Sequence, residues 1–215
     1  MPDPPILLIF DFDNTLIDSR IDYTGLRATL AGMLEEAGAR VEPREALLGL
    51  PLVDLVERGA ALSPALADRM WACIEAAEAD GLRGAAAIPH AREVLTALRR
   101  RGFLLAVLTN NARPGTTAAL AGLELAPLLE QAVTRDDVPR LKPDPSGVRL
   151  LLERIRPVRA AYLVGDSWID GLAAEAAGIR FVGFGPRRAD AEARGLRPWA
   201  WVMDLRELLD LAWES

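Results

Sequence analysis

Several residue types are nearly missing from this chain of 215 residues. It contains one cysteine, Cys73, and one histidine, His90. A single cysteine excludes an intrachain disulfide and a cysteine-based zinc site, and one histidine adds too little to build another kind of zinc site. We therefore expect Cys73 to be a small packed residue. His90 follows Pro89 at the start of a predicted helix, and we interpret it as structural.

Long apolar runs and an excess of basic charge are missing as well. No stretch approaches the roughly 18 continuous apolar residues that a membrane-spanning helix needs, and the first residues lack the basic region of a signal peptide. The formal net charge of −6 argues against broad binding to a nucleic-acid backbone. We expect a cytoplasmic protein, monomeric or homodimeric, that binds neither membrane nor nucleic acid.

Short apolar segments alternate with helical patterns along most of the chain. The predicted strands are 6–10, 103–108, 160–164 and 180–184, with weaker candidates at 131–134 and 200–203. The predicted helices between them are 89–101, 145–155 and 168–177. Near-continuous apolar strands are typical of a parallel sheet that is buried on both faces. The alternation predicts an α/β fold with a doubly wound, Rossmann-like parallel sheet.

The segment 18–87 breaks this alternation. Its helical patterns cover residues 23–37, 43–48, 52–60 and 63–79, and Ser63 followed by Pro64 is typical of a helix start. We expect no strand within it. The sequence therefore predicts a catalytic core made of residues 1–17 and 88–215, with an inserted all-helical cap domain at 18–87.

Polar residues directly follow three of the predicted strands. They are Asp11 and Asp13 after the first, Thr109 and Asn110 after 103–108, and Asp166 and Asp170 after 160–164. Because ligands of parallel α/β sheets bind at the carboxyl ends of the strands, we expect these residues at one site. An isolated Asp there is often only a turn residue. Clustered carboxylates repel by roughly 4 kcal/mol per pair at about 4 Å, so the set favours a hard dication such as Mg²⁺.

Four short motifs in this chain resemble those of the haloacid dehalogenase superfamily. They are Asp11-Phe-Asp-Asn-Thr15-Leu, Leu108-Thr-Asn110, Lys142-Pro-Asp144 and Gly165-Asp-Ser-Trp-Ile-Asp170. The first motif alone is a weak pattern, but all four occur in the family's order. The helical insert resembles the cap of the phosphoglycolate phosphatase-like branch, and Gly49-Leu50-Pro51-Leu52 resembles a substrate-contacting loop of that cap.

The resemblance implies a phosphatase that forms an aspartyl-phosphate. Asp11 would be the nucleophile, and Asp13 would act as general acid and then general base. Thr109 and Lys142 would contact the transferring phosphoryl group, and Asn110 would be a further substrate-binding residue. Lys142 could also be an ordinary solvated lysine, but it is the only lysine of the chain and it precedes a proline in a loop, which favours the catalytic role.

The resemblance also implies a metal site and a substrate site. The Mg²⁺ ligands would be the carboxylates of Asp11 and Asp166 and the backbone carbonyl of Asp13, and Asp170 would either bind the ion or orient the site. Gly49 would contact the substrate from the cap. The substrate would be a small phosphorylated metabolite, with phosphoglycolate as the first candidate and a sugar phosphate or nucleoside monophosphate close behind.

Three residues depart from the family's commonest pattern. Asn14 stands where glycine is frequent, but asparagine tolerates the left-handed backbone of such a turn. Trp168 either shields the metal site or begins a helix packed on the core, and we favour the helix. Asn111 stands where related phosphatases often carry lysine, which weakens the transfer of any one substrate.

Other functions on the same scaffold stay open at this point. A phosphomutase would return the phosphoryl group to a sugar. A catalytically silent binding or regulatory protein would be expected to have lost at least one of Asp11, Asp13, Lys142 and Asp166. A dehalogenase is disfavoured, because Asp13 and the pair Asp166 and Asp170 would have no role in displacing a halide.

Overall fold

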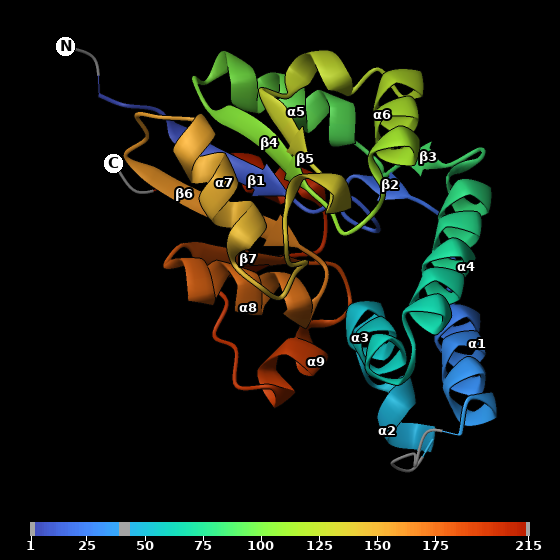
Figure 1. The fold of residues 1–215 in the computed structure, drawn as a ribbon. Helices are drawn as coiled ribbons and strands as arrows, with labels where there is room; N and C mark the ends of the chain where they lie inside the picture. Colours follow the sequence, from blue (N-terminus) through green and yellow to red (C-terminus); the bar gives the residue numbers. More distant parts are fainter. Residues whose placement is uncertain (1–2, 39–43, 214–215) are drawn as a thin grey trace. The chain divides into compact units, whose positions relative to one another are not determined.

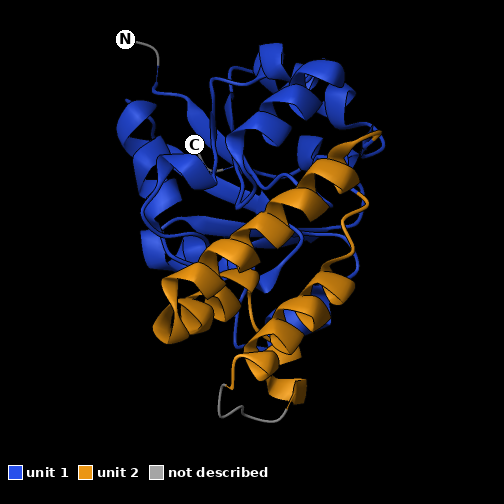
Figure 2. Cartoon of the chain, turned by 45° about the vertical axis from the view of Figure 1, so that its right-hand side comes forward, with its two compact units in different colours: residues 1–19, 85–215 blue, residues 20–84 orange. Residues whose placement is uncertain are grey.

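The computed structural model describes residues 3–38 and 44–213. The chain divides into two compact units, which Figure 2 draws in two colours. One unit comprises Met1–Ser19 and Ala85–Ser215, and the other comprises Arg20–Gly84. The sequence predicts a core of residues 1–17 and 88–215 and a cap of residues 18–87. That these are separate domains stays a prediction.

The larger unit contains a six-stranded parallel sheet (Figure 1). Its strands are β1 (Ile6–Phe10), β4 (Leu104–Leu108), β5 (Gln131–Val133), β6 (Ala160–Gly165), β7 (Arg180–Phe184) and β8 (Ala200–Val202). They lie in the order β5-β4-β1-β6-β7-β8, and every neighbouring pair is parallel. All six strands expected from the sequence are therefore present, and the predicted Rossmann-like sheet is confirmed.

The strand order places the point where the chain changes direction beside β1. From β1 the chain builds β4 and β5 on one side of the sheet and then returns to build β6, β7 and β8 on the other. Phe10 is paired with Val107 of β4 and with Val164 of β6, so the three strands end nearly level. The residues that follow them are thereby brought to one edge of the sheet, which is where ligands of such sheets bind.

Helices cover both faces of this sheet. The larger unit contains the helices α5 (Ala91–Arg100), α6 (Arg113–Gly122), α7 (Ser146–Arg154), α8 (Trp168–Ala177) and α9 (Arg188–Ala193), with 3₁₀ segments η1 (Ala126–Leu128), η2 (Arg135–Asp137) and η3 (Leu205–Leu209). Val148 of α7 and Ala174 of α8 share a buried cluster with Ile9 and Leu163. The alternate strand residues, such as Phe10, face the opposite side, where α5 contacts β4 and η3. The sheet is therefore doubly wound.

The smaller unit is helical over the residues that the structure describes. Its helices are α1 (Tyr23–Glu36), α2 (Arg44–Leu48), α3 (Leu52–Leu62) and α4 (Pro64–Leu82). They enclose a core of their own around Leu30, Leu55 and Met70. The four helices agree with the sequence patterns, although the expected start of α2 at residue 43 lies outside the described residues. Ser63 is the N-cap residue of α4, but its side chain makes no capping hydrogen bond.

A short antiparallel ribbon pairs the segment that leads into the helical unit with the segment that leads out of it. It consists of β2 (Ile17–Asp18) and β3 (Ala86–Ala87), with Ile17 opposite Ala87. The expectation of no strand in 18–87 is therefore wrong at both ends of that segment. Strands of two residues carry no readable alternation, and their partners lie far apart in the sequence, so a local pattern does not reveal them.

Candidate active site

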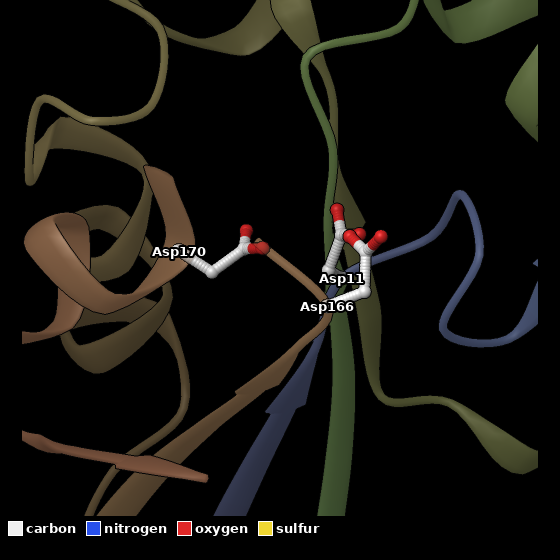
Figure 3. A group of neighbouring side chains, drawn as sticks. All are labelled: Asp11, Asp166 and Asp170. Carbon is white, nitrogen blue, oxygen red and sulfur yellow. The ribbon is translucent and has the colours of Figure 1, made fainter. Parts of the chain in front are cut away.

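Three buried carboxylates meet at the carboxyl edge of the sheet. Asp11 follows β1, Asp166 follows β6, and Asp170 lies in the first turn of α8. One oxygen atom of each lies within 4.8 Å of the others, and Figure 3 shows the side chains converging from these separate elements. The edge that the sequence predicted for a site therefore brings these three residues together.

The start of α8 holds Asp170 in place. Ser167 caps the helix by accepting a hydrogen bond from the backbone N–H of Ile169 (3.0 Å), and Asp170 Oδ2 accepts one from the backbone N–H of Ser167 (3.2 Å). This reciprocal arrangement is a capping box. At Gly165, a Cβ atom would lie 2.5 Å from Asp170 Cγ, so only glycine permits this approach. The Asp170 carboxylate thus caps the helix and faces the site.

Lys142 lies between two of the carboxylates. Its ammonium Nζ donates to Asp11 Oδ1 (2.5 Å), to Asp170 Oδ1 (2.7 Å) and to the backbone carbonyl of Leu108 (2.9 Å). The side chain is 4% exposed, so Lys142 is not an ordinary solvated lysine. Asn110 fixes its backbone, because Asn110 Nδ2 donates to the Lys142 carbonyl and Asn110 Oδ1 accepts from the Lys142 N–H, both at 2.9 Å. The contact expected between Asn110 and a substrate stays a prediction.

The electrostatics of the group favour an added positive charge. Burial, together with the charges of Asp11 and Asp170, raises the pKa of Asp166 to about 8. Burial and the Asp11 charge raise the pKa of Asp170 to about 6. Burial also disfavours the charged form of Lys142, but the two carboxylates outweigh it, so the pKa of Lys142 lies above its ordinary value. Ionising all three carboxylates together is therefore unfavourable without a further positive charge, and their hard oxygen donors fit a cation such as Mg²⁺.

Asp13 is buried beside this group, and its carboxylate is held by a different residue. Asn111 Nδ2 donates to Asp13 Oδ2 at 2.7 Å, and both residues are buried. The ligand expected from Asp13 is its backbone carbonyl, and that role stays a prediction. Asn14 adopts φ 58°, the left-handed conformation expected for it. The turn therefore survives without glycine.

Two buried threonines, Thr109 and Thr15, lie in the segments that follow β4 and β1. Thr109 is 2% exposed, directly follows β4, and its hydroxyl accepts a hydrogen bond from the backbone N–H of Asn111 at 3.1 Å. The hydroxyl of Thr15 lies 3.4 Å from Asp11 Oδ2. The phosphoryl contact expected of Thr109 stays a prediction, and the Thr15 contact was not expected.

Arg187 is a further residue of the site that the sequence did not lead us to expect. Its Nη1 donates to Asp166 Oδ2 at 3.0 Å. Arg187 follows β7 by way of Gly185, which has φ 77°, and Pro186. Arg187 therefore stands past a strand end in the same way as the other residues of the site. The rule that identified Asp11 and Asp166 would have identified Arg187 had it been applied to β7.

The remaining expected residues have structural surroundings. Trp168 begins α8, as favoured, and the Arg194 guanidinium lies 4.4 Å from the centre of its ring. His90 is the N-cap residue of α5 at φ 66°, in keeping with a structural role. Cys73 packs against the core of the helical unit. Gly49 is exposed in the turn between α2 and α3, and its contact with substrate stays a prediction.

Comparison with known proteins agrees with the motifs. A profile described as haloacid dehalogenase-like hydrolase matches residues 8–184. The phosphoglycolate phosphatase of Nitrosospira multiformis is 35% identical over 190 residues, covering 82% of this chain and 82% of that protein. The phosphoglycolate phosphatase of Pseudomonas putida is 32% identical over 222 residues, covering 95% of this chain and 79% of that protein.

Solved structures agree on the fold. The crystal structure of a hydrolase from Pseudomonas syringae has a TM-score of 0.72 and 22% identity, covering 95% of this chain and 96% of that one. Among residues 3–38 and 44–213, no helix has the length and apolar character needed to cross a bilayer.

Proposed function

This chain belongs to the haloacid dehalogenase-like hydrolase family and is a phosphatase, and from that premise we propose that it is magnesium-dependent and works through an aspartyl-phosphate on Asp11. One observation carries the proposal. Lys142 holds the buried Asp11 carboxylate by a contact of 2.5 Å, in a group that also contains Asp166 and Asp170. A carboxylate held in this way at the carboxyl edge of the sheet is placed to act as a nucleophile.

In the first step, a carboxylate oxygen of Asp11 attacks the phosphorus of the substrate. The new oxygen–phosphorus bond forms on Asp11 while the ester oxygen–phosphorus bond breaks, and the departing alkoxide takes a proton from Asp13. Lys142 contacts both Asp11 and Asp170, so its charge offsets the negative charge that would repel an anionic substrate. A general acid in the position proposed for Asp13 typically raises the rate of such a step by about 10²–10⁴-fold.

In the second step, Asp13 acts as a base. Its carboxylate removes a proton from water, the water oxygen bonds to phosphorus, and the bond between Asp11 and phosphorus breaks. Inorganic phosphate and free Asp11 result, and Asp13 is again protonated for the next turnover. The hydrogen bond from Asn111 at 2.7 Å holds the Asp13 carboxylate in one orientation for both proton transfers.

The residues present fit a magnesium ion. Asp11, Asp166, Asp170 and the backbone carbonyl of Asp13 would hold it, and all of these are the hard oxygen ligands that Mg²⁺ takes. When bound, the ion supplies positive charge to the oxygens of the transferring phosphoryl group. Lys142 adds a second positive charge, which neutralises part of the negative charge of Asp11 and Asp170.

We propose phosphoglycolate as the first substrate to test. Two relatives at 32% and 35% identity are named phosphoglycolate phosphatase. In this proposal the helical unit is the cap, which excludes water during the reaction and selects the substrate. Arg20, Tyr23 and Gly49 of that unit are the positions from which substrate contacts are expected.

The experiment compares turnover of 2-phosphoglycolate, a sugar phosphate, a nucleoside monophosphate and p-nitrophenyl phosphate, with Mg²⁺ and with EDTA. We expect Asp11→Asn to lower kcat by at least about 10³-fold. Asp210→Asn, an exposed position, is the matched control and is expected to keep full activity. Mass spectrometry of acid-quenched protein is expected to find one phosphoryl group on Asp11.

The outcomes separate the alternatives. Activity that survives EDTA or Asp11→Asn contradicts the proposed mechanism. Isomerisation of the sugar phosphate in place of hydrolysis indicates a phosphomutase. Failure to turn over any of the four substrates indicates a catalytically silent binding protein.

A further inference from the structure

A second cation, Arg187, contacts the carboxylate group, and unlike Lys142 it is exposed to solvent. Arg187 Nη1 lies 3.0 Å from Asp166 Oδ2, and the Arg187 side chain is 53% exposed while that of Asp166 is 9% exposed. Lys142 is buried and contacts Asp11 and Asp170. The two cations therefore divide the three carboxylates between them, one from within the protein and one from its solvent-facing side.

A divalent cation in this group would draw on the same carboxylate as Arg187. Asp166 is one of the three residues whose oxygens lie within 4.8 Å of one another. The guanidinium keeps its charge at any physiological pH, and like charges a few ångströms apart repel strongly where water is partly excluded. Binding of the ion and the contact between Arg187 and Asp166 therefore oppose each other.

We propose that Arg187 competes with the divalent cation for Asp166 and thereby weakens metal binding at this site. The inference rests on the proposed function in taking Asp11, Asp166 and Asp170 as the metal site. It adds a residue that adjusts the affinity of that site: occupancy requires the guanidinium to turn away from Asp166 or to tolerate the ion beside it. The exposed arginine side chain has solvent into which it can turn.

The opposite role makes the opposite prediction. A residue that orients a ligand by hydrogen bonding supports metal binding, and its removal weakens binding about 10–100-fold. A competing cation does the reverse, so its removal tightens binding. The sign of the change in Mg²⁺ affinity therefore decides between the two roles, and the substrate and the chemical step play no part in the measurement.

The experiment titrates Mg²⁺ into the substrate-free, full-length protein by calorimetry at fixed pH and ionic strength. We expect Arg187→Gln to bind Mg²⁺ about tenfold more tightly than the wild type, which corresponds to about 1.4 kcal/mol. Arg187→Lys keeps the charge and is expected to stay within about threefold of the wild type. Arg188→Gln is the matched control, because Arg188 is exposed and pairs with Glu192, and it is expected to have no effect.

Two further measurements complete the test. The rise in melting temperature on adding Mg²⁺ is expected to be larger for Arg187→Gln, because a tighter ligand stabilises the folded state more. Raising the ionic strength is expected to narrow the difference between Arg187→Gln and the wild type, because salt screens a half-exposed charge.

Unchanged or weaker Mg²⁺ binding by Arg187→Gln overturns the inference while leaving the proposed function standing. A wild-type protein that binds no Mg²⁺, and behaves like Asp166→Asn in the same titration, overturns both. Circular dichroism of each variant verifies that it is folded before its affinity is compared.

Discussion

The two ends of the same parallel sheet are built for opposite purposes. At the carboxyl ends of the strands, Asp11 and Asp166 are buried among like charges. At the amino ends, aromatic rings gather. The ring centres of Trp199 and Trp213 lie 5.3 Å apart, and Trp213 also lies 4.8 Å from Tyr162. Strand β6 belongs to both ends, since it contains Tyr162 and is followed by Asp166.

The aromatic end adds to the stability of the fold, whereas the acidic end lowers it. At the aromatic end each contact adds to burial, and the Arg180 guanidinium lies 5.9 Å from the ring centres of both Tyr162 and Trp199, within cation–π range. At the acidic end, the raised pKa values of Asp166 and Asp170 record the free energy needed to ionise buried neighbours. The contacts at the first end add to stability, and the second end is arranged for chemistry.

The largest expected effect is at Lys142, because its charge is expected to support both the activity and the stability of the folded protein. We expect Lys142→Met to lower kcat/KM for p-nitrophenyl phosphate by about 10³-fold, because the carboxylates it contacts are left to repel an anionic substrate. The same change is expected to lower the free energy of unfolding in EDTA by about 3 kcal/mol. Steady-state kinetics and urea unfolding measure the two. Arg100→Met, on the exposed side of α5, is the control, and retention of a tenth of the activity by Lys142→Met would contradict its role.

The next effect concerns Asp166, whose pKa is raised to about 8 from 3.8. The folded protein keeps this proton at pH values where the unfolded chain has lost it, so its contribution to stability falls as pH rises from about 4 to about 8. In EDTA, urea unfolding is expected to show a steeper loss of stability over this range for the wild type than for Asp166→Asn. At 100 times its dissociation constant, Mg²⁺ is expected to add about 2.7 kcal/mol to the wild type and nothing to the variant. Parallel pH curves would count against this assignment.

A smaller effect is expected at the aromatic end. Trp213→Ala removes ring contacts with Tyr162, Trp199 and Phe103 and is expected to lower the free energy of unfolding by about 2 kcal/mol, because this side chain is only partly buried. We expect kcat/KM of the folded enzyme to be unchanged. Met203→Ala, at a residue that is 62% exposed, is the control and is expected to change stability by less than about 0.5 kcal/mol. A parallel loss of activity in Trp213→Ala would break the separation between the two ends.

The smallest effect is expected at Asn111. Asn111→Ala removes the hydrogen bond to Asp13 and is expected to lower kcat about tenfold while KM changes little, because the acid and base is displaced and substrate contacts stay. Asn111→Gln, which keeps the amide, is expected to recover part of the loss. A change confined to KM would show that Asn111 acts on substrate binding and not on Asp13.

Much of the fold could be predicted because its signals are local. The apolar runs that became β1 and β6 identify strands without any partner in view, and Gly178 ends α8 in the left-handed conformation that stops a helix. Helix α6 was not expected, because Pro114, Gly115 and two threonines near its start weaken the helical pattern. The ribbon of β2 and β3 was not predicted for a related reason, because strands of two residues are too short to show an alternation of apolar and polar residues.

The residues alone determined the order of strands and helices and the positions of Asp11, Asp13 and Asp166 behind strands, because periodicity and strand ends lie within a few neighbouring positions. Only the tertiary structure decided which groups touch. Lys142 meets Asp11 across 131 positions of sequence and Asn111 meets Asp13 across 98, while Arg187 reaches Asp166 from the next strand. Strand order and register set these pairings, and neither is written in any single stretch of the chain.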